Sequence, residues 1–552
     1  MGFHVSKFDA FYESCRIPNP ENDTSFPNVF ILGCLEQRVS FLAQQTRAIN
    51  LILALQHRKT LSPDKRLCIV GGGVAGTTAA VYASHEGIKS TVFEKTAMPF
   101  SLQAGSRRWL HPNINDWPRP GWEQKRTNLP VMNWEADEAT KVIATLRSEW
   151  QKALNTSSIA FHHSASPTLE KTANAWLLKW NGKQEEADIV ILAVGFGEER
   201  TANGISGTYW HDSNDHQALT NGGSVLISGS GDGGLTDTLR IALRDFSHSW
   251  LGELAETKSL GNLAEAVSKI ENNLEDYATP VQLTQSYLNL PFPQDLLDKL
   301  QARRKTNLRT FLNAQGKAPF RRSSAPIHRV LIAALIKLKI VEYIPGELDN
   351  ESITSREEGG FDVTVTEGNK STKKHYDRIL LRHGTNSALK ASFPQIAEIV
   401  KSTRSHNQLR PALSHLTRAP LWLESKDPGV APPQTAAPST AQKQRVAKTT
   451  RSLQEHVRKN LTKIGKTTCA EDIHTGVIKF DIEYGAPNDI RRATLAFHIS
   501  PTKTGTCIQM RILAPKKFKR TQTLASDWQS LDAHSIEKSI QQAFNDLDGA
   551  NR

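Results

Sequence analysis

The segment 66–95, RLCIVGGGVAGTTAAVYASHEGIKSTVFEK, constrains the fold of this chain more than any other stretch. A short apolar run at 67–70 predicts a buried strand, and the small residues that follow predict a helix broken at Gly87. A second predicted strand at 90–93 ends at an acid, Glu94. Between the first strand and the helix lie three glycines in the spacing GxGxxG, namely Gly71, Gly73 and Gly76.

Each part of this segment suits the binding of a dinucleotide. In such a turn the first glycine permits a tight bend, the second lets the backbone approach a pyrophosphate, and the third lets the helix pack closely on the strand. The N-terminus of the helix offers N–H groups and a partial positive charge to the phosphates. Glu94 stands where a carboxylate accepts hydrogen bonds from ribose hydroxyls. We therefore predict a dinucleotide site at this turn.

A second glycine turn follows a predicted strand at 224–228. Its sequence, GSGDGG, repeats the spacing at Gly229, Gly231 and Gly234, and residues 235–243 are predicted to form the helix after it. The later elements of the two halves also correspond, since each half ends in a strand that begins with Asp and reaches a glycine, at 188–195 and 377–384. We predict an α/β fold with a Rossmann-like domain and a second, divergent Rossmann-like domain.

Composition narrows the class of protein. A chain of 552 residues should form two to four domains at roughly 150 residues each. No apolar run approaches the ~20 residues of a membrane span, and the N-terminus lacks the features of a signal peptide. The five cysteines are scattered without a CxxC pair, which favours a reducing cytoplasm and disfavours dithiol chemistry or a cysteine-bound metal. We expect a cytoplasmic protein.

These features resemble the two-dinucleotide-binding-domain flavoproteins, the group that includes flavin-dependent monooxygenases and pyridine nucleotide–flavin oxidoreductases. The resemblance covers about residues 66–390 and implies that the first turn and Glu94 bind FAD. It also implies that the segment 193–195, Ala-Val-Gly, corresponds to the Ala-Thr-Gly motif of the group, which places Gly195 at the cofactor. The glycines of the second turn, Gly229, Gly231 and Gly234, then correspond to a site for NAD(P)H.

Two acids in the second half depart from this pattern. Asp232 lies inside the second turn and Asp237 lies early in its helix, where a carboxylate would repel a diphosphate. The second-strand residue that distinguishes NAD from NADP is not recognisable in the sequence. Many flavoproteins carry a strand–Gly-Asp–helix motif whose Asp holds the flavin ribityl chain, so Asp232 is an alternative ligand of FAD.

The residues that cover the flavin are expected in the irregular segment 99–134, which is rich in tryptophan, proline and arginine. Long irregular loops are usually functional or disordered, and aromatic content disfavours disorder. The catalytic candidates are Arg107 and Arg108, for charge near the flavin or substrate, and His111, for proton transfer near neutral pH. Trp109 is a candidate for stacking on the flavin; the alternative is that these side chains only pack within the loop.

The chain therefore divides into five predicted parts. These are an N-terminal arm and helix (1–65), an FAD-binding domain (66–222), a second nucleotide-binding domain (223–424) with a helical insertion (245–320), a Pro/Ala-rich linker (425–450) and a small basic α+β module (451–552). Residues 441–552 hold 19 Lys and Arg against 11 Asp and Glu, which suggests an acidic partner.

The predicted function is an FAD-dependent oxidoreductase that uses NAD(P)H and acts on a small-molecule substrate, with monooxygenation as one form of that chemistry. The alternative is a sensor or effector that binds FAD or NAD(H) and whose basic C-terminal module engages a protein or nucleic-acid partner.

Overall fold

The computed structural model describes residues 6–17, 26–34, 39–203, 205, 209–210, 222–273, 279–406 and 420–423, together with five strands between 466 and 524. It divides into two units, Met1–Pro433 and Gln434–Arg552. The linker expected at 425–450 lies outside the described residues, as do the parts of the α+β module (451–552) other than these five strands. Among the described helices, none is long and apolar enough to cross a membrane.

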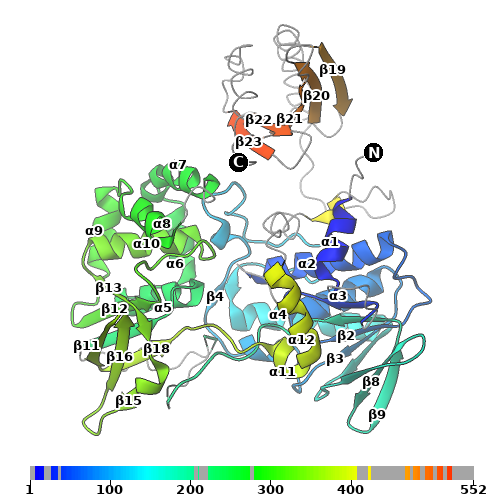
Figure 1. Cartoon of the computed structure of the whole chain (residues 1–552), viewed down its shortest axis with the longest axis horizontal. Helices are drawn as coiled ribbons and strands as arrows, with labels where there is room; N and C mark the ends of the chain where they lie inside the picture. The colour runs from blue at the N-terminus through cyan, green and yellow to red at the C-terminus, as the bar shows by residue number, and fades with distance from the viewer. Residues whose placement is uncertain are drawn as a thin grey trace. The chain divides into compact units, whose positions relative to one another are not determined.

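The first half of the larger unit is built on a parallel sheet (Figure 1). Its strands, in spatial order, are β1 (Val29–Ile31), β10 (Ile189–Leu192), β2 (Leu67–Val70), β3 (Ser90–Phe93) and β6 (Ile159–His162). The helices of this half are α1 (Lys7–Cys15), α2 (Phe41–His57), α3 (Val74–His85) and α4 (Ala139–Thr156). An antiparallel meander of β7 (Thr168–Lys171), β8 (Trp176–Trp180) and β9 (Lys183–Ala187) precedes β10. The central strands are apolar and buried, as the sequence predicts for parallel strands covered on both faces.

The N-terminal segment belongs to this layer. β1 pairs in parallel with β10, so residues expected to form a separate arm extend the first sheet at its edge. Helix α2 packs against α1 and α3 through a buried apolar face that includes Ile49, Ile52 and Leu55. The first domain therefore includes β1 and α2, which precede residue 66.

The second half repeats the layout around a parallel sheet. Its strands, in spatial order, are β13 (Val341–Pro345), β12 (Leu308–Ala314), β11 (Gly223–Ser228) and β18 (Arg378–Leu381). Helix α5 (Asp232–Ala242) follows β11, and α10 (Pro326–Lys337) joins β12 to β13. A small antiparallel sheet of β14 (Glu347–Leu348), β15 (Thr354–Ser355), β16 (Phe361–Glu367) and β17 (Lys370–Tyr376) lies between β13 and β18 in the chain.

The helical insertion is shorter than expected. Its helices are α6 (His248–Ala255), α7 (Lys258–Asn272), α8 (Pro280–Leu288) and α9 (Gln294–Ala302), so they end before residue 303. Residues 308–314, expected within the insertion, instead form β12, which pairs in parallel with β11. Strand β12 is therefore the second strand of the βαβ unit that the second glycine turn opens.

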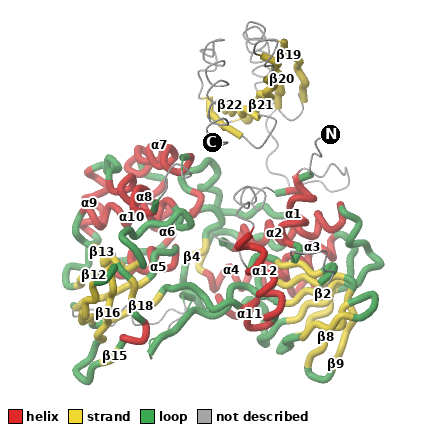
Figure 2. The backbone as a smooth tube through the Cα atoms, in the orientation of Figure 1, coloured by secondary structure: helices red, strands yellow, loops and turns green. Residues whose placement is uncertain are grey.

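Two segments tie the halves together. The loop 106–117, which the sequence assigns to the first half, inserts Ile114 and Trp117 into the apolar core of the second half. In return, α11 (Ala388–Ser392) and α12 (Pro394–His406) follow β18 and pack Phe393 and Ile396 against the first sheet. Figure 2 shows the first of these connections mainly as loop. It contains a short 3₁₀ turn, Ile114–Asp116, and the strand β4 (Trp109–Leu110), which pairs with β5 (Asp137–Glu138).

The smaller unit contains an antiparallel meander. Its strands are β19 (Lys466–Asp472), β20 (Val477–Tyr484), β21 (Arg491–Pro501), β22 (Thr506–Leu513) and β23 (Lys519–Leu524). Strands β20 to β22 form the middle of this sheet, and β19 and β23 form its two edges.

Candidate active site

Both glycine turns open into one cavity of about 1440 Å³. Its wall includes Gly71 and Gly73 of the first turn, Gly229 and Gly231 of the second, and residues of the loop 108–115. Pockets for a single small molecule usually measure ~300–1,000 Å³. The cavity therefore has room for more than one such ligand, and it brings the two predicted nucleotide sites into one space.

The first turn has the backbone geometry that its glycines predict. Gly71 has φ +118°, and a β-carbon at this position would lie 2.2 Å from the carbonyl oxygen of Ala193. A β-carbon on Gly76 would lie 1.9 Å from the carbonyl oxygen of Gly71, so only glycine permits this approach of α3 to the strand. A β-carbon on Gly73 meets nothing within 4 Å, which leaves open space where a pyrophosphate would lie.

Glu94 is held rigidly at the wall of the cavity. Its Oε2 accepts a hydrogen bond from the backbone N–H of Gly72 at 2.7 Å, and its Oε1 accepts from the N–H and hydroxyl of Thr96 at 2.8 and 2.7 Å. A carboxylate has further lone pairs for ribose hydroxyls. Together with the space above Gly73, this arrangement fits the adenosine end of FAD.

Helix α2 supplies a second helix N-terminus to the cavity. Its N-cap residue, Ser40, and the side chains of Phe41 and Gln44 line the wall. The Gln44 amide donates to the carbonyl of Gly33 at 3.2 Å, so β1, Gly33 and α2 form a strand–glycine–helix unit beside β10. Cys34 occupies the position after this glycine, and burial raises the pKa of its thiol to about 12.

The second turn repeats the geometry of the first. A β-carbon on Gly229, whose φ is +130°, would lie 2.1 Å from the carbonyl oxygen of Arg382. One on Gly234 would lie 1.9 Å from the carbonyl oxygen of Gly229, whereas one on Gly231 meets nothing within 4 Å. The space that the first turn offers to a diphosphate is thus present in the second turn as well.

The two acids near this turn have partners within the protein. Asp237 is fully buried and accepts hydrogen bonds from Nη2 of Arg108 at 2.7 Å and from Nε of Arg382 at 2.6 Å. The expected repulsion of a diphosphate by Asp237 is therefore wrong, because two guanidinium groups balance its charge.

Asp232 lies at the wall of the cavity, where its Oδ1 accepts from the N–H of Ala325 at 2.6 Å and faces Nδ1 of His328 at 3.1 Å. The carboxylate is thus held at the start of α10. Its predicted role as a ligand of the flavin ribityl chain stays a prediction.

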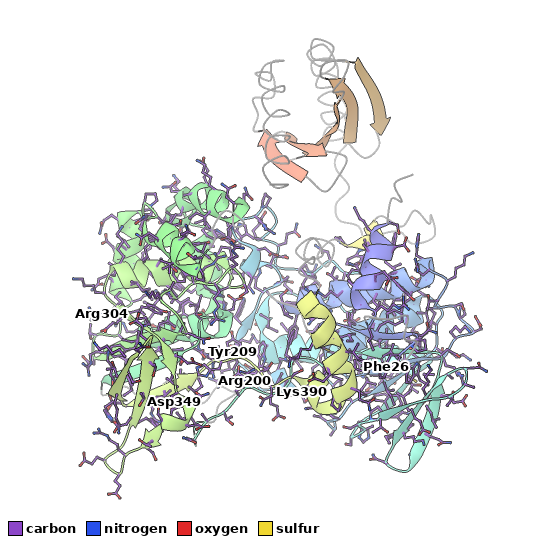
Figure 3. All side chains as sticks on the ribbon, in the orientation of Figure 1. Phe26, Arg200, Tyr209, Arg304, Asp349 and Lys390 are labelled. Atoms are coloured by element: carbon purple, nitrogen blue, oxygen red, sulfur yellow. The ribbon has the colours of Figure 1, made fainter. Side chains whose placement is uncertain are left out.

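The two candidate arginines of the irregular loop differ in position. Arg108 lines the cavity, is 5% exposed and stacks over the ring of Tyr209 at 3.6 Å, in the region where Figure 3 labels Tyr209 and Arg200. Arg107 is exposed and is not among the residues that line the cavity. Trp109 lines the cavity and is half-buried, as a residue facing a cofactor would be.

His111 also lines the cavity, but its protonation state differs from the expectation. Its Nδ1 accepts hydrogen bonds from the N–H groups of Asn113 and Ile114 at 3.1 and 3.0 Å. Burial, together with the charge of Lys125, lowers the pKa of this imidazole to about 4. His111 is therefore neutral near pH 7 with its proton on Nε2, which suits a hydrogen-bond donor better than the expected proton carrier.

Ser228 and Asn313 lie at the carboxyl ends of β11 and β12 and line the same cavity, yet the sequence did not single them out. Asn313 fell within the expected helical insertion. The signal available was the strand-like run 308–314, LRTFLNA, which precedes a glycine-containing turn.

Residues 65–236 match the family described as pyridine nucleotide-disulphide oxidoreductase. The search of curated proteins gives no match. Among solved structures, a bacillithiol disulfide reductase from Staphylococcus aureus matches at 12% identity over 58% of this chain and 77% of its own, with a TM-score of 0.34. A thioredoxin reductase from T. acidophilum matches at 12% identity over 58% of this chain and 78% of its own, with a TM-score of 0.30. An HOCl-induced flavoprotein disulfide reductase from Escherichia coli matches at 13% over 59% of each chain, with a TM-score of 0.30.

The family match confirms the expected resemblance to two-dinucleotide-binding-domain flavoproteins. It also confirms the class of activity, an FAD-dependent oxidoreductase. The cavity brings the two glycine turns into one site.

Proposed function

We propose that this protein oxidises NADPH at the second glycine turn and passes the electrons, through FAD bound at the first turn, to a small-molecule acceptor. The observation that carries the proposal is the single cavity shared by the two turns. FAD supplies the hydride-accepting chemistry, and the protein supplies position and electrostatics. Gly73 and Glu94 hold its adenosine end, while the N-terminus of α2 and the loop of Arg108 and Trp109 form further parts of the wall.

The end of β12 supports NADPH over NADH. In dinucleotide folds an acid at the end of the second strand binds the ribose 2′-hydroxyl of NAD, and an arginine nearby accommodates the 2′-phosphate of NADP. Strand β12 ends at Ala314 and is followed by Gln315, so no acid occupies this position. Arg321, which follows this strand in the chain, lines the cavity. We therefore assign the 2′-phosphate of NADPH to Arg321.

The acceptor in this proposal is a small molecule because the described cysteines are poor redox partners. Cys15, Cys34 and Cys68 are buried and form no disulfide, and burial raises the pKa of both Cys34 and Cys68. The thiolate is the reactive form of cysteine, so these residues suit a reducing cytoplasm and an unreactive role. We propose molecular oxygen as the acceptor, which makes a monooxygenase or an oxidase the finer form of the function.

The test is the visible absorption spectrum of the purified protein under anaerobic conditions, before and after addition of NADPH or NADH. We expect a flavin spectrum that NADPH bleaches at lower concentration than NADH does. A colourless protein that binds no added FAD contradicts the proposal. After air is admitted, the ratio of hydrogen peroxide formed to NADPH consumed distinguishes an oxidase from a monooxygenase given its substrate.

A protein or nucleic-acid partner for the basic module 451–552 remains a separate proposal. It rests on the excess of lysine and arginine in that part of the sequence.

A further inference from the structure

His383 follows β18 and stands at the carboxyl edge of the second sheet, next to the second glycine turn. It lines the cavity and is half-buried. Its neighbour across the sheet is Ser228, the last residue of β11, whose Oγ lies 2.7 Å from Nε2 of the imidazole. The proposed function assigns no role to the His383 side chain.

A chain of hydrogen bonds fixes which nitrogen of His383 carries the proton. The amide nitrogen of Asn313 donates to the carbonyl oxygens of Ile344 and Gly346 at 2.9 and 3.0 Å, so its Oδ1 must face Ser228. The Ser228 hydroxyl donates its one proton to that oxygen at 2.6 Å. It can therefore only accept from His383, and the imidazole must carry its proton on Nε2.

The other nitrogen of the ring is left as an acceptor. No partner of Nδ1 is found among the described residues. Burial, with a contribution from the charge of Arg200, lowers the pKa of His383, so the ring is neutral near pH 7. A neutral ring protonated on Nε2 presents a lone pair on Nδ1.

The order of the strands tells which end of a dinucleotide His383 faces. A dinucleotide lies across the carboxyl edge of such a sheet at the point where the strand order reverses. In the order β13-β12-β11-β18 the reversal lies between β11 and β18. The adenosine half then lies over β12, beside Gln315 and Arg321, and the nicotinamide half lies over β18.

We propose that Nδ1 of His383 accepts a hydrogen bond from a hydroxyl of the ribose on the nicotinamide side of NADPH. This inference rests on the proposed function of the second turn and adds a residue that orients the reactive end of the reductant. Ser228 and Asn313 act through His383 by holding the ring in one tautomer.

Two substitutions separate the two nitrogens of the ring. Asparagine places its amide near the position of Nδ1 and can present an acceptor there, whereas glutamine reaches the position of Nε2 and keeps the contact with Ser228. We expect His383→Gln to weaken NADP⁺ binding to the FAD-loaded protein roughly three- to tenfold by isothermal titration calorimetry, as loss of a neutral hydrogen bond does. His383→Asn should restore binding to within about twofold.

Steady-state kinetics of the same two variants provide a second test. The KM for NADPH should rise in His383→Gln with kcat little changed, because the lost bond contributes equally before and during hydride transfer. His163→Gln, at an exposed histidine that does not line the cavity, should change neither quantity. Equal weakening by the glutamine and asparagine variants, or none in either, overturns the inference.

The pH dependence tests the direction of the hydrogen bond. As the pH falls below 6.5, protonation of Nδ1 turns the acceptor into a donor, so NADP⁺ binding should weaken more in the wild-type protein than in His383→Asn. Binding that tightens instead would mean that the imidazolium contacts a phosphate, and the inference fails. If NADPH leaves the flavin spectrum unchanged while NADP⁺ binding still follows the predicted order, the proposed function fails and His383 keeps its role.

Discussion

At the residue scale, the contacts of Asp237 connect the two halves of the larger unit. Its carboxylate joins Arg108, from the loop of the first half, to Arg382, at the end of β18. Arg382 also reaches Glu199, in the segment that follows β10, at 3.1 Å. Although burial opposes ionisation, the two guanidinium groups hold the pKa of Asp237 below its usual value.

Replacement of this carboxylate should be costly. In Asp237→Asn the shape is kept but Arg108 and Arg382 lose a shared buried counter-charge, and removal of one partner of a buried pair costs roughly 3–5 kcal/mol. Urea unfolding followed by circular dichroism measures the loss. The control is Glu265→Gln, at an ion pair with Lys269 in which both side chains are exposed, where we expect little change. Similar losses in the two variants would contradict the role of Asp237.

The buried, neutral His111 makes stability depend on pH. Its pKa in the folded protein is about 4, below the ordinary value of 6.5, so the unfolded chain takes up the proton first as the pH falls. The free energy of unfolding should therefore decrease between pH 6.5 and 4, at most by about 1.4 kcal/mol per pH unit. His111→Asn keeps an acceptor for the N–H groups of Asn113 and Ile114 but does not titrate, so its decrease should be smaller. Parallel pH profiles for the two proteins would rule out this effect.

At the element scale, the glycines of the two strand–turn–helix units show the same division of roles. The first and third glycines of each turn let backbone approach backbone, and the second faces open space. The sequence spacing predicts this division, and the positions of the carbonyl oxygens of Ala193 and Arg382 show what the first glycine avoids in each unit.

This division predicts opposite outcomes for neighbouring substitutions. Gly73→Ala should fold normally, because φ at this position is −77° and the space is open, but it should weaken FAD binding at least tenfold by filling the space of the pyrophosphate. Gly76→Ala should instead lower the free energy of unfolding by several kcal/mol through its clash with the backbone of Gly71. FAD titration and chemical denaturation measure the two effects, and normal FAD affinity in Gly73→Ala would contradict the assignment.

The same comparison applies to the second turn, where φ of Gly231 is −75°. Gly231→Ala should keep bound FAD and lose affinity for NADPH, measured by anaerobic titration of the flavin absorbance. Loss of FAD in this variant would assign the second turn to the flavin instead, in line with the alternative role of Asp232.

At the scale of the whole molecule, the chain divides after Pro433 into units that are each internally connected. The last described residues of the larger unit, 420–423, still belong to its core, since Leu421 is fully buried and its N–H donates to Asn50 at 3.0 Å. The described residues that line the shared cavity belong to the larger unit.

Removal of residues 434–552 should therefore leave the flavin chemistry intact. We expect the shortened protein to bind FAD and to oxidise NADPH at a rate within about twofold of the full chain. If the smaller unit engages an acidic partner, its loss should abolish that binding, and binding by the full chain should weaken as salt rises. Loss of FAD from the shortened protein would show that the smaller unit contributes to the site.

The sequence by itself determined the two glycine turns, the acid after the first, the class of fold and the presence of a long irregular segment after that acid. These are local features, since spacing along one strand, turn and helix fixes them through short-range geometry. What the tertiary structure decided depends on parts of the chain far apart in sequence: β1 beside β10, β12 as the second strand of its unit, and Asp237 between two arginines. Pairing of distant strands and burial of opposite charges depend on the whole packed chain, and no short stretch of sequence encodes them.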